Sequence, residues 1–300
     1  MNGKGDPNTY MLFIESLYKA YGKNMVLDNI DLQVRAGELV TVVGPSGCGK
    51  STLLRIILGE DRASSGTILI DGKAVGFPDV TRGIVYQKYT LIPNLTALEN
   101  ISFGKEMQAG LFGKKEVKKQ MREEARYFLE QVNLGEHANQ YPHQLSGGQQ
   151  QRVAIAQALI MKPKILLMDE PFGALDPATR EHQQVFLIDL WQRYAMTIFF
   201  ITHDLDEAVF LGTRVLALSP YYRDGRGEHV PHGAKIIVDQ KLEWPTRTTA
   251  IKETAEFGKR KQSIRAALYK ESHRAFVTQF NLSHPDAFQT LTDEEARQDV

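Results

Sequence analysis

A glycine-rich segment near position 50 constrains the fold of this 300-residue chain more than any other feature. It reads Gly44-Pro-Ser-Gly-Cys-Gly-Lys50-Ser51, between the apolar run Leu39–Val43 and a stretch with helical spacing of apolar residues that ends at Leu58. Glycines in such a loop let successive backbone N–H groups point inward at a helix N-terminus, which attracts anions. The segment predicts a phosphate-binding loop between a buried strand and a helix, and therefore a nucleotide site. The alternative is a plain glycine-rich turn between strand and helix.

The residues of the loop have predictable roles. Lys50 is expected to reach the β- and γ-phosphate oxygens, and the Ser51 hydroxyl to ligate Mg²⁺. Because Cys48 lies inside the loop, we expect its alkylation to block activity and ATP to protect it. The candidate nucleotide ligands are Gly44, Pro45, Ser46, Gly47, Cys48, Gly49, Lys50, Ser51 and Thr52.

Composition limits the class of protein. Hydrophobic residues make up 42% and charged residues 24% of the chain, as in ordinary globular proteins. A formal net charge of zero gives no overall basic field that would gather nucleic acid. The single cysteine excludes an internal disulfide and a cysteine-based zinc cluster, and it suits a reducing cytosol. No apolar run approaches the ~18 residues that span a bilayer, and no secretory signal is apparent. Any membrane step is therefore expected to need another chain.

The order of elements predicts an α/β fold. Apolar strands at 39–43, 164–168 and 197–201 alternate with helices, which is typical of a parallel sheet. Residues 11–36 look rich in strands, and the dipeptides Ser65-Gly66 and Asp71-Gly72 are expected to form turns around a short strand. The segment 65–72 is therefore interpreted as a hairpin.

The segment between Thr90 and Tyr141 is expected to be entirely helical. Thr96 and Glu99 fit a capping box that opens one helix, and a second helix is predicted over 114–132. Its apolar stripe consists of Val117, Met121, Ala125, Phe128 and Val132. We expect a helical subdomain over about 91–150, inserted into a nucleotide-binding domain that spans 11–240.

Two further motifs carry chemistry. In Leu145-Ser-Gly-Gly-Gln149, Ser146 can cap a helix with Gln149 completing a capping box. Each glycine in that first turn costs about 1 kcal/mol relative to alanine, a cost that is easier to understand if a ligand approaches the backbone. Asp169 and Glu170 end the apolar run 165–168, where open parallel sheets bind ligands.

In order along the chain, these motifs resemble those of the nucleotide-binding subunits of ABC transporters. The set comprises the phosphate loop, Gln87, the Leu-Ser-Gly-Gly-Gln signature, the Asp169-Glu170 pair, Gly173-Ala-Leu-Asp176 and His203, and the resemblance covers roughly residues 11–240. It implies a RecA-like P-loop NTPase core with an antiparallel β subdomain and an inserted helical signature subdomain. ATP and Mg²⁺ are the implied cofactors.

The resemblance also implies roles for single residues. Glu170 is the expected general base for the attacking water, and His203 is expected to brace the γ-phosphate and that water. Asp169 would hold Mg²⁺ through water, and Gln87 would contact Mg²⁺ and the attacking water. Tyr21 would stack on adenine, although a core position for this tyrosine is the alternative.

In the family, the signature closes over the ATP of a second subunit. Ser146, Gly147, Gly148 and Gln149 would therefore bind the γ-phosphate across the interface of a head-to-tail homodimer, with Asp176 at the seam. Two composite ATP sites per dimer are expected, and hydrolysis would release the dimer.

Phe172–Arg180 and His203–Leu211 look like the nitrate, sulfonate and taurine branch of bacterial importers. The expected activity is ATP hydrolysis that energises uptake of a small anionic or organic solute. The expected partners are permease subunits, bound through a groove near Gln87 and 89–95, and indirectly a periplasmic substrate-binding protein. This places the chain on the cytoplasmic face of the inner membrane. The alternatives are an exporter ATPase, or a soluble ABC ATPase acting on nucleic acid or ribosomes. One phosphate loop, one cysteine and the lack of sustained heptads argue against the soluble class.

Residues 241–300 are expected to form a charged, helical C-terminal extension, treated as a separate appendage. A helix near 259–280, with Ile264 and Leu268, is expected to pack on the sheet domain or to act as a regulatory or dimer-stabilising element. The long loop 219–233 carries no functional prediction.

Overall fold

Two β-sheets organise the residues that the computed structural model describes, which are 9–87, 90–108, 115–222, 232–243 and 248–268. The larger sheet has six strands in the order β10-β9-β3-β8-β7-β6. Neighbouring strands in this sheet run parallel, except that β10 runs antiparallel to β9. Its strands are β3 (Leu39–Val43), β6 (Arg82–Val85), β7 (Ile165–Asp169), β8 (Thr197–Ile201), β9 (Arg214–Ser219) and β10 (Lys235–Lys241).

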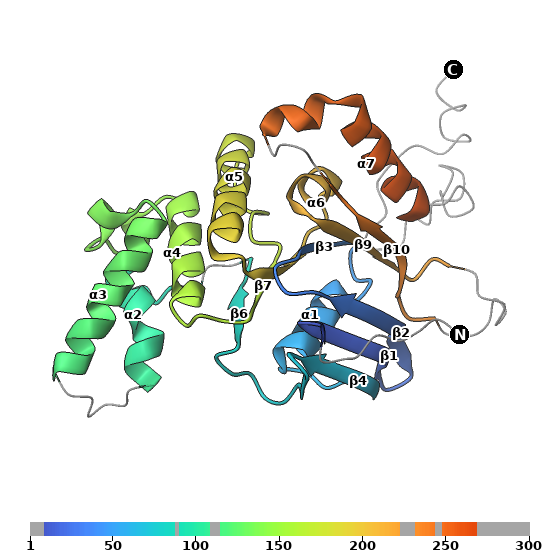
Figure 1. Ribbon diagram of the computed structural model, residues 1–300, viewed down its shortest axis with the longest axis horizontal. Helices are drawn as coiled ribbons and strands as arrows, with labels where there is room; N and C mark the ends of the chain where they lie inside the picture. The colour runs from blue at the N-terminus through green and yellow to red at the C-terminus, as the bar shows by residue number, and fades with distance from the viewer. Residues whose placement is uncertain (1–8, 88–89, 109–114, 223–231, 244–247, 269–300) are drawn as a thin grey trace, which may run out of the picture.

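The central strands of this sheet are the apolar runs found in the sequence. Every residue of β3 and β8 is buried, and β7 is buried until its last residue, Asp169. Strands of this kind need cover on both faces, and helices lie on each side of the sheet in Figure 1. The prediction of a parallel α/β core is confirmed.

The second sheet is antiparallel, with the order β2-β1-β4-β5. Its strands are β1 (Leu12–Tyr21), β2 (Asn24–Val34), β4 (Ser65–Ile70) and β5 (Lys73–Ala74). Asp71-Gly72 forms the predicted turn, with φ of 49° and 70°. The prediction of a turn at Ser65-Gly66 is wrong, because both residues lie in β4.

The glycine at position 66 has a different cause. A β-carbon there would lie 2.3 Å from the carbonyl oxygen of Ser16, at an irregularity in the pairing of β1 with β4. Ser16 itself has a φ of 47°. Gly66 therefore permits a close approach of two strands rather than a change of chain direction.

Three helices lie side by side at one end of the molecule, shown in green in Figure 1. They are α2 (Ala97–Gln108), α3 (Lys115–Gln131) and α4 (Gly147–Leu159). The capping box at Thr96 is confirmed, since Glu99 Oε2 accepts from Thr96 N at 2.9 Å and Thr96 Oγ1 accepts from Glu99 N at 3.3 Å. The apolar stripe of α3 is buried from Ala125 onward, whereas Val117 is 36% exposed.

The remaining helices pack on the large sheet. They are α1 (Lys50–Leu58), α5 (Pro177–Tyr194), α6 (Leu205–Leu211) and α7 (Ala255–Leu268), with a short 3-10 segment, η4 (Thr249–Glu253). Phe257, Ile264 and Leu268 of α7 belong to the same buried cluster as α6 and β9. Up to Leu268 the C-terminal segment therefore covers the core, while the boundary near 240 stays a prediction. The rest of the helix expected over 259–280 lies outside the described residues.

None of the helices in the described ranges is both long and apolar enough to cross a membrane.

Candidate functional site

The phosphate loop joins the buried strand β3 to α1, as the spacing predicted. Gly49 is the N-cap of α1 with a φ of 107°, and no side chain caps the helix. A β-carbon at Gly49 would lie 2.9 Å from Leu27 and 3.0 Å from Val26, so β2 packs directly against the loop. The first N–H groups of α1 therefore have no side-chain acceptor, which suits an anionic ligand.

Cys48 does not fit the expectation placed on it. Its thiol is 6% exposed and donates to the carbonyl oxygen of Leu218 in β9 at 3.4 Å, and its N–H donates to Pro45 O at 3.3 Å. Burial raises the pKa of the thiol. The side chain packs into the core beneath the loop, so it does not support the prediction that alkylation reports on the phosphate site.

Lys50 is a buried cation at the first position of α1. Its Nζ donates to Gly44 O at 2.9 Å and to Pro45 O at 3.1 Å, and the residue is 6% exposed. Both partners are neutral carbonyls, so the positive charge has no counter-charge among its hydrogen-bond partners. A desolvated cation of this kind is suited to a phosphate oxygen.

Ser51 and Asp169 place two oxygens together at the base of the loop. Ser51 Oγ donates to Asp169 Oδ1 at 3.3 Å. Burial raises the pKa of the Asp169 carboxyl, and the charge of Glu170 adds to the rise. A hydroxyl and a carboxylate beside a phosphate loop match the ligands that Mg²⁺ takes in nucleotide sites. Within the described residues no cluster of three or more acidic, histidine or cysteine side chains forms a separate metal site.

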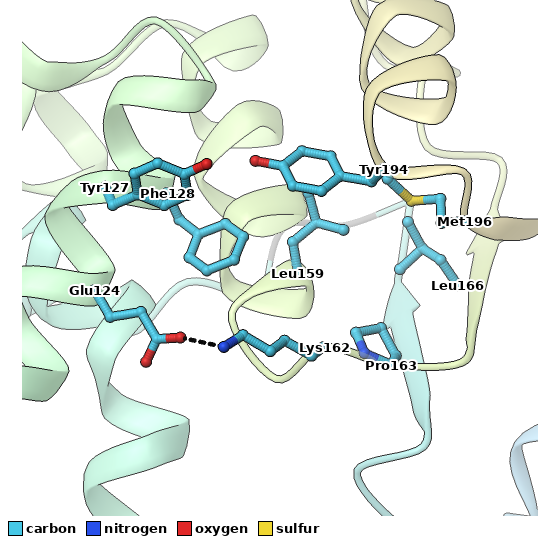
Figure 2. A pocket seen from close by; sticks show the side chains of 9 residues that line it. All are labelled: Glu124, Tyr127, Phe128, Leu159, Lys162, Pro163, Leu166, Tyr194 and Met196. Atoms are coloured by element: carbon cyan, nitrogen blue, oxygen red, sulfur yellow. Dashed lines mark ion pairs between the residues drawn. The ribbon is translucent and has the colours of Figure 1, made fainter.

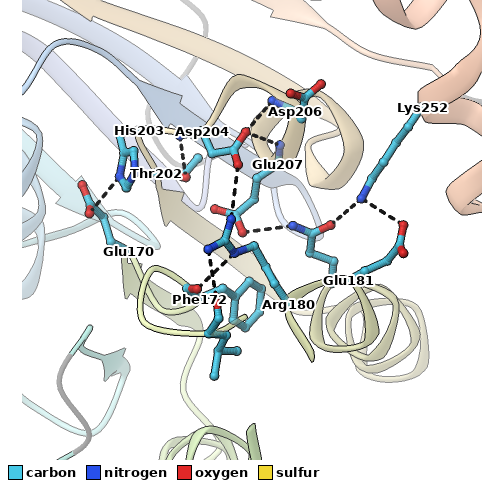
Figure 3. Close-up of polar contacts among 12 residues, drawn as sticks. Glu170, Phe172, Arg180, Glu181, Thr202, His203, Asp204, Asp206, Glu207 and Lys252 are labelled. Carbon is cyan, nitrogen blue, oxygen red and sulfur yellow. Dashed lines mark hydrogen bonds and ion pairs between the residues drawn. The ribbon is translucent and has the colours of Figure 1, made fainter. Parts of the chain in front are cut away.

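Glu170 and His203 meet at the carboxyl ends of neighbouring strands. The parallel register sets Asp169 beside Ile201, and the next residues bring Glu170 Oε2 within 3.0 Å of His203 Nδ1 (Figure 3). Glu170 has a φ of 46°, in the left-handed region that non-glycine residues rarely adopt. Such backbone strain is typical of functional sites.

Gln87 lies next to this pair. It follows β6 and is exposed, and a β-carbon at Gly173 would lie 3.2 Å from its Nε2. Gly173 N in turn donates to Glu170 O at 3.1 Å. The side chain of Gln87 is therefore close to the turn that carries Glu170, as its expected role requires.

Tyr21 ends β1 with its ring 47% exposed, so the alternative of a core tyrosine does not hold. Its hydroxyl donates to Asp61, which raises the pKa of Tyr21, while the neighbouring Thr52 of α1 lowers it. Lys19 Nζ lies 4.4 Å from the ring centroid. An exposed aromatic ring is thereby held beside the first turn of α1.

The signature segment begins α4, and its capping box is confirmed. Ser146 Oγ accepts from Gln149 N at 3.3 Å, and Gln149 Oε1 accepts from Ser146 N at 2.8 Å. A β-carbon at Gly148 would lie 2.8 Å from Thr179 Cγ2 of α5, so close helix packing explains that glycine without a ligand. Figure 1 shows α4 on the other side of β6 from α1. Helix α4 packs mainly on α2, α3, α5 and β6.

Asp176 is exposed and caps α5, accepting from Thr179 N at 3.0 Å. Arg180, which the sequence reasoning missed, donates to Phe172 O at 3.3 Å and to Leu175 O at 2.9 Å, and its Nη1 lies 3.8 Å from Asp204 Oδ2. It joins the turn after Glu170 to the N-cap of α6. The sequence did contain a sign of this role. A cation in the first turn of a helix is unfavourable to the helix dipole, so an arginine there indicates a compensating interaction elsewhere.

Among the hollows outside this cluster, two border the helices α3 and α4. One, of about 350 Å³, is mainly apolar and opens between α3 and the end of α5, with the hydroxyls of Tyr127 and Tyr194 facing each other (Figure 2). Burial, followed by the Tyr127 hydroxyl, raises the pKa of Tyr194 to about 12. The other, of about 390 Å³, lies between β6 and α4 and includes Val80, Tyr86, Thr90 and Met161.

Comparison with known proteins gives consistent relatives. Residues 27–173 match the family described as ABC transporter. An uncharacterized ABC transporter ATP-binding protein of Methanocaldococcus jannaschii is 45% identical over 86% of this chain and 92% of its own length. The nitrate import ATP-binding protein NrtD of Synechocystis is 44% identical over 82% of this chain and 89% of its own length. The aliphatic sulfonates import ATP-binding protein SsuB of Bacillus anthracis is 42% identical over 78% of this chain and 86% of its own length.

Solved structures agree with the fold. The dimeric post-hydrolysis structure of an ATP-binding cassette bound to ADP and Pi has a TM-score of 0.62 and 33% identity, covering 78% of this chain and 100% of that one. CbiO1 from Clostridium perfringens, part of an ABC transporter complex, has a TM-score of 0.68 and 26% identity. The match covers 87% of this chain and 95% of CbiO1.

Proposed function

Because the chain belongs to the ABC transporter family of ATP-binding proteins, we propose that it hydrolyses ATP to energise uptake of a small anionic or organic solute by a bacterial importer. The observation that carries the catalytic part is the pairing of Glu170 with His203. These residues are 33 positions apart, and their side chains meet at 3.0 Å at the carboxyl end of the sheet. The phosphate loop lies on the same end of the neighbouring strand β3.

The residues divide the chemistry among them. Lys50 and the uncapped start of α1 bind the phosphates, and Tyr21 stacks on the adenine. When bound, Mg²⁺ supplies charge neutralisation of the phosphate oxygens, and Ser51, Asp169 and Gln87 are the residues that would hold it. Glu170 orients and polarises the attacking water as general base, and His203 holds that water and the γ-phosphate in place.

The active form is proposed to be a head-to-tail homodimer. The start of α4 is remote from the phosphate loop of its own chain. The N–H groups of Ser146 and Gln149 are taken up by the capping box, so those of Gly147 and Gly148 are the candidates for a second copy. Asp176 lies at the start of α5, the helix packed against Gly148. The signature then completes the ATP site of the partner, and hydrolysis lets the pair separate.

The membrane partner is proposed to bind the hollow between β6 and α4. This hollow is lined largely by apolar side chains and lies next to Gln87, so a permease helix seated there would contact the loop that senses the nucleotide. Tyr89 of the expected groove lies outside the described residues. The solute class is inferred from NrtD and SsuB, and the chain would lie at the cytoplasmic face of the inner membrane, with a periplasmic binding protein as an indirect partner.

Glu170→Gln tests the assignment. The variant should lose almost all steady-state ATPase activity yet bind ATP, because the amide keeps the shape and loses the base. Size-exclusion chromatography with ATP should show it as a dimer, while the wild type returns to monomer after hydrolysis. Normal turnover in Glu170→Gln would refute the base assignment. Co-purification with ribosomes or DNA instead of an integral permease would refute the transport assignment.

A further inference from the structure

The C-terminal segment contacts the helix that follows His203. That helix, α6, has only seven residues, a length at which a helix depends on tertiary packing for its stability. Its inner face is fully buried, and Phe257, Ile264 and Leu268 of α7 belong to the same cluster. The position of His203 is therefore linked to whatever fixes the start of α6.

The first turn of α6 is strongly acidic. Asp204, Asp206 and Glu207 stand within four positions, and Asp204 Oδ1 accepts from the N–H groups of Asp206 at 2.8 Å and Glu207 at 3.3 Å. Acidic residues suit a helix N-terminus, but neighbouring carboxylates repel one another unless cations lie nearby. Glu207 is 4% exposed, and burial raises the pKa of its carboxyl, so this group depends on its hydrogen-bond partners.

Two lysines of the C-terminal segment are connected to this turn, Lys261 directly and Lys252 through Gln184. Lys261 Nζ in α7 lies 2.7 Å from Asp206 Oδ1. Lys252 Nζ in η4 donates to Gln184 Oε1 at 2.8 Å, and Gln184 Nε2 donates to Glu207 Oε1 at 3.1 Å (Figure 3). The ammonium of Lys252 also lies 4.5 Å from the ring centroid of Phe210 and 3.4 Å from Glu181.

Gln184 links Lys252 to Glu207 in one orientation of its amide. It is 3% exposed, and its amide has one oxygen that accepts from Lys252 and one nitrogen that donates to Glu207. Reversing the amide would set its nitrogen against an ammonium and its oxygen against a carboxylate. Lys252 therefore fixes the orientation in which Gln184 can bind Glu207.

We propose that Lys252 and Lys261 are positioning residues for His203, which they act on by holding the acidic first turn of α6 from the C-terminal segment. Neither lysine touches the nucleotide, and the inference rests on the proposed function of His203. Residues 248–268 would thus contribute to turnover while contributing little to ATP binding, because Tyr21, Lys50 and Ser51 lie on other elements.

Steady-state kinetics of the full chain test this inference. Lys252→Met and Lys261→Met keep the length of the aliphatic stem and remove the charge. The matched control is Lys259→Met, at an exposed position of α7. We expect kcat to fall roughly three- to tenfold in each of the first two variants, with the KM for ATP changed less than about twofold. Lys261→Arg should restore most of the activity, since its half-exposed site has room for a larger cation.

A second readout does not depend on turnover. In ¹H–¹³C spectra of histidine-labelled protein, the His203 signal, assigned by its loss in His203→Ala, should shift or broaden in both methionine variants and not in Lys259→Met. A kcat and a His203 signal equal to those of Lys259→Met would overturn the inference. If the wild type has no ATPase activity, the proposed function fails, and the spectra still decide whether the lysines position His203.

Discussion

At the scale of single residues, the site depends on side chains held by the ends of neighbouring strands. Glu170 adopts a φ of 46°, and its backbone N–H donates to Ile201 O at 2.9 Å. The residue is therefore anchored to β8 while its side chain contacts His203. Lys50 is anchored by loop carbonyls. These groups are held in place by the protein before any ligand binds, which is how binding sites limit the cost of ordering.

Cys48 gives a prediction at this scale. Because burial raises the pKa of its thiol, the thiolate fraction at a given pH is lower than for a free cysteine, and the sulfur is also covered by the core. Native protein at pH 8 should therefore react with a disulfide reagent at least about tenfold more slowly than protein unfolded in guanidinium, with or without ATP. Release of the coloured thiolate measures both rates. Rapid native reaction that ATP slows would show instead that the sulfur faces the phosphate site.

At the scale of elements, the contact between α4 and α5 determines where the signature lies. Gly148 sits in the first turn of α4, and the stiff, β-branched Thr179 of α5 occupies the space that a side chain at 148 would need. Asp176 caps α5 one turn before that contact. The signature and the candidate seam residue are thus fixed relative to each other by helix packing.

The pair Gly148→Ala and Gly258→Ala tests this packing. In both, alanine gains helix propensity, but at 148 the new β-carbon would lie 2.8 Å from Thr179, whereas at 258 nothing lies within 4 Å. Gly148→Ala should lower the free energy of unfolding by about 1–3 kcal/mol. Gly258→Ala should leave it unchanged or raise it by up to about 1 kcal/mol. Urea denaturation measures both, and a Gly148→Ala variant as stable as the wild type would show that α4 shifts without cost.

Local features of this fold follow from the sequence, whereas several non-local features do not. Strands β3, β7 and β8, the capping boxes at Thr96 and Ser146, and the Asp71-Gly72 turn follow from local composition, and all were predicted. The direction of the Cys48 side chain and the reason for Gly66 depend on residues far away in the chain, and the contact of Arg180 with Asp204 likewise joins two different helices. No spacing rule brings Leu218 to position 48, so the burial of the sulfur could not be predicted from the sequence.

At the scale of the whole molecule, the described part of the C-terminal segment belongs to the core of the nucleotide-binding unit. Leu242, Ile251, Phe257, Ile264 and Leu268 are each 8% exposed or less. The sequence made this region look weakly helical and charged, because its buried residues are few and spaced between lysines and glutamates. Burial of α7 against α6 and β9 decides its structure, and that contact is invisible to a local pattern.

Phe257→Ala and Phe77→Ala compare a buried with an exposed phenylalanine. Phe257 is 1% exposed and Phe77 78% exposed. Removing the Phe257 ring should cost about 3–5 kcal/mol of unfolding free energy, through lost burial and the cavity left behind. Phe77→Ala should change it by less than about 0.5 kcal/mol. Equal stabilities in urea titration would mean that the C-terminal helix is only loosely attached.

The register between β7 and β8 constrains how this protein can diverge. Since Asp169 pairs beside Ile201, a one-residue insertion within either strand would separate Glu170 from His203 and also turn the buried side chains to the opposite face. The turn between α5 and β8 has no such restriction, because it lies at the opposite end of β8 from His203. Changes in chain length should therefore be tolerated in this turn and rejected inside the strands, so that the distance between the two residues in sequence can drift while their distance in space is conserved.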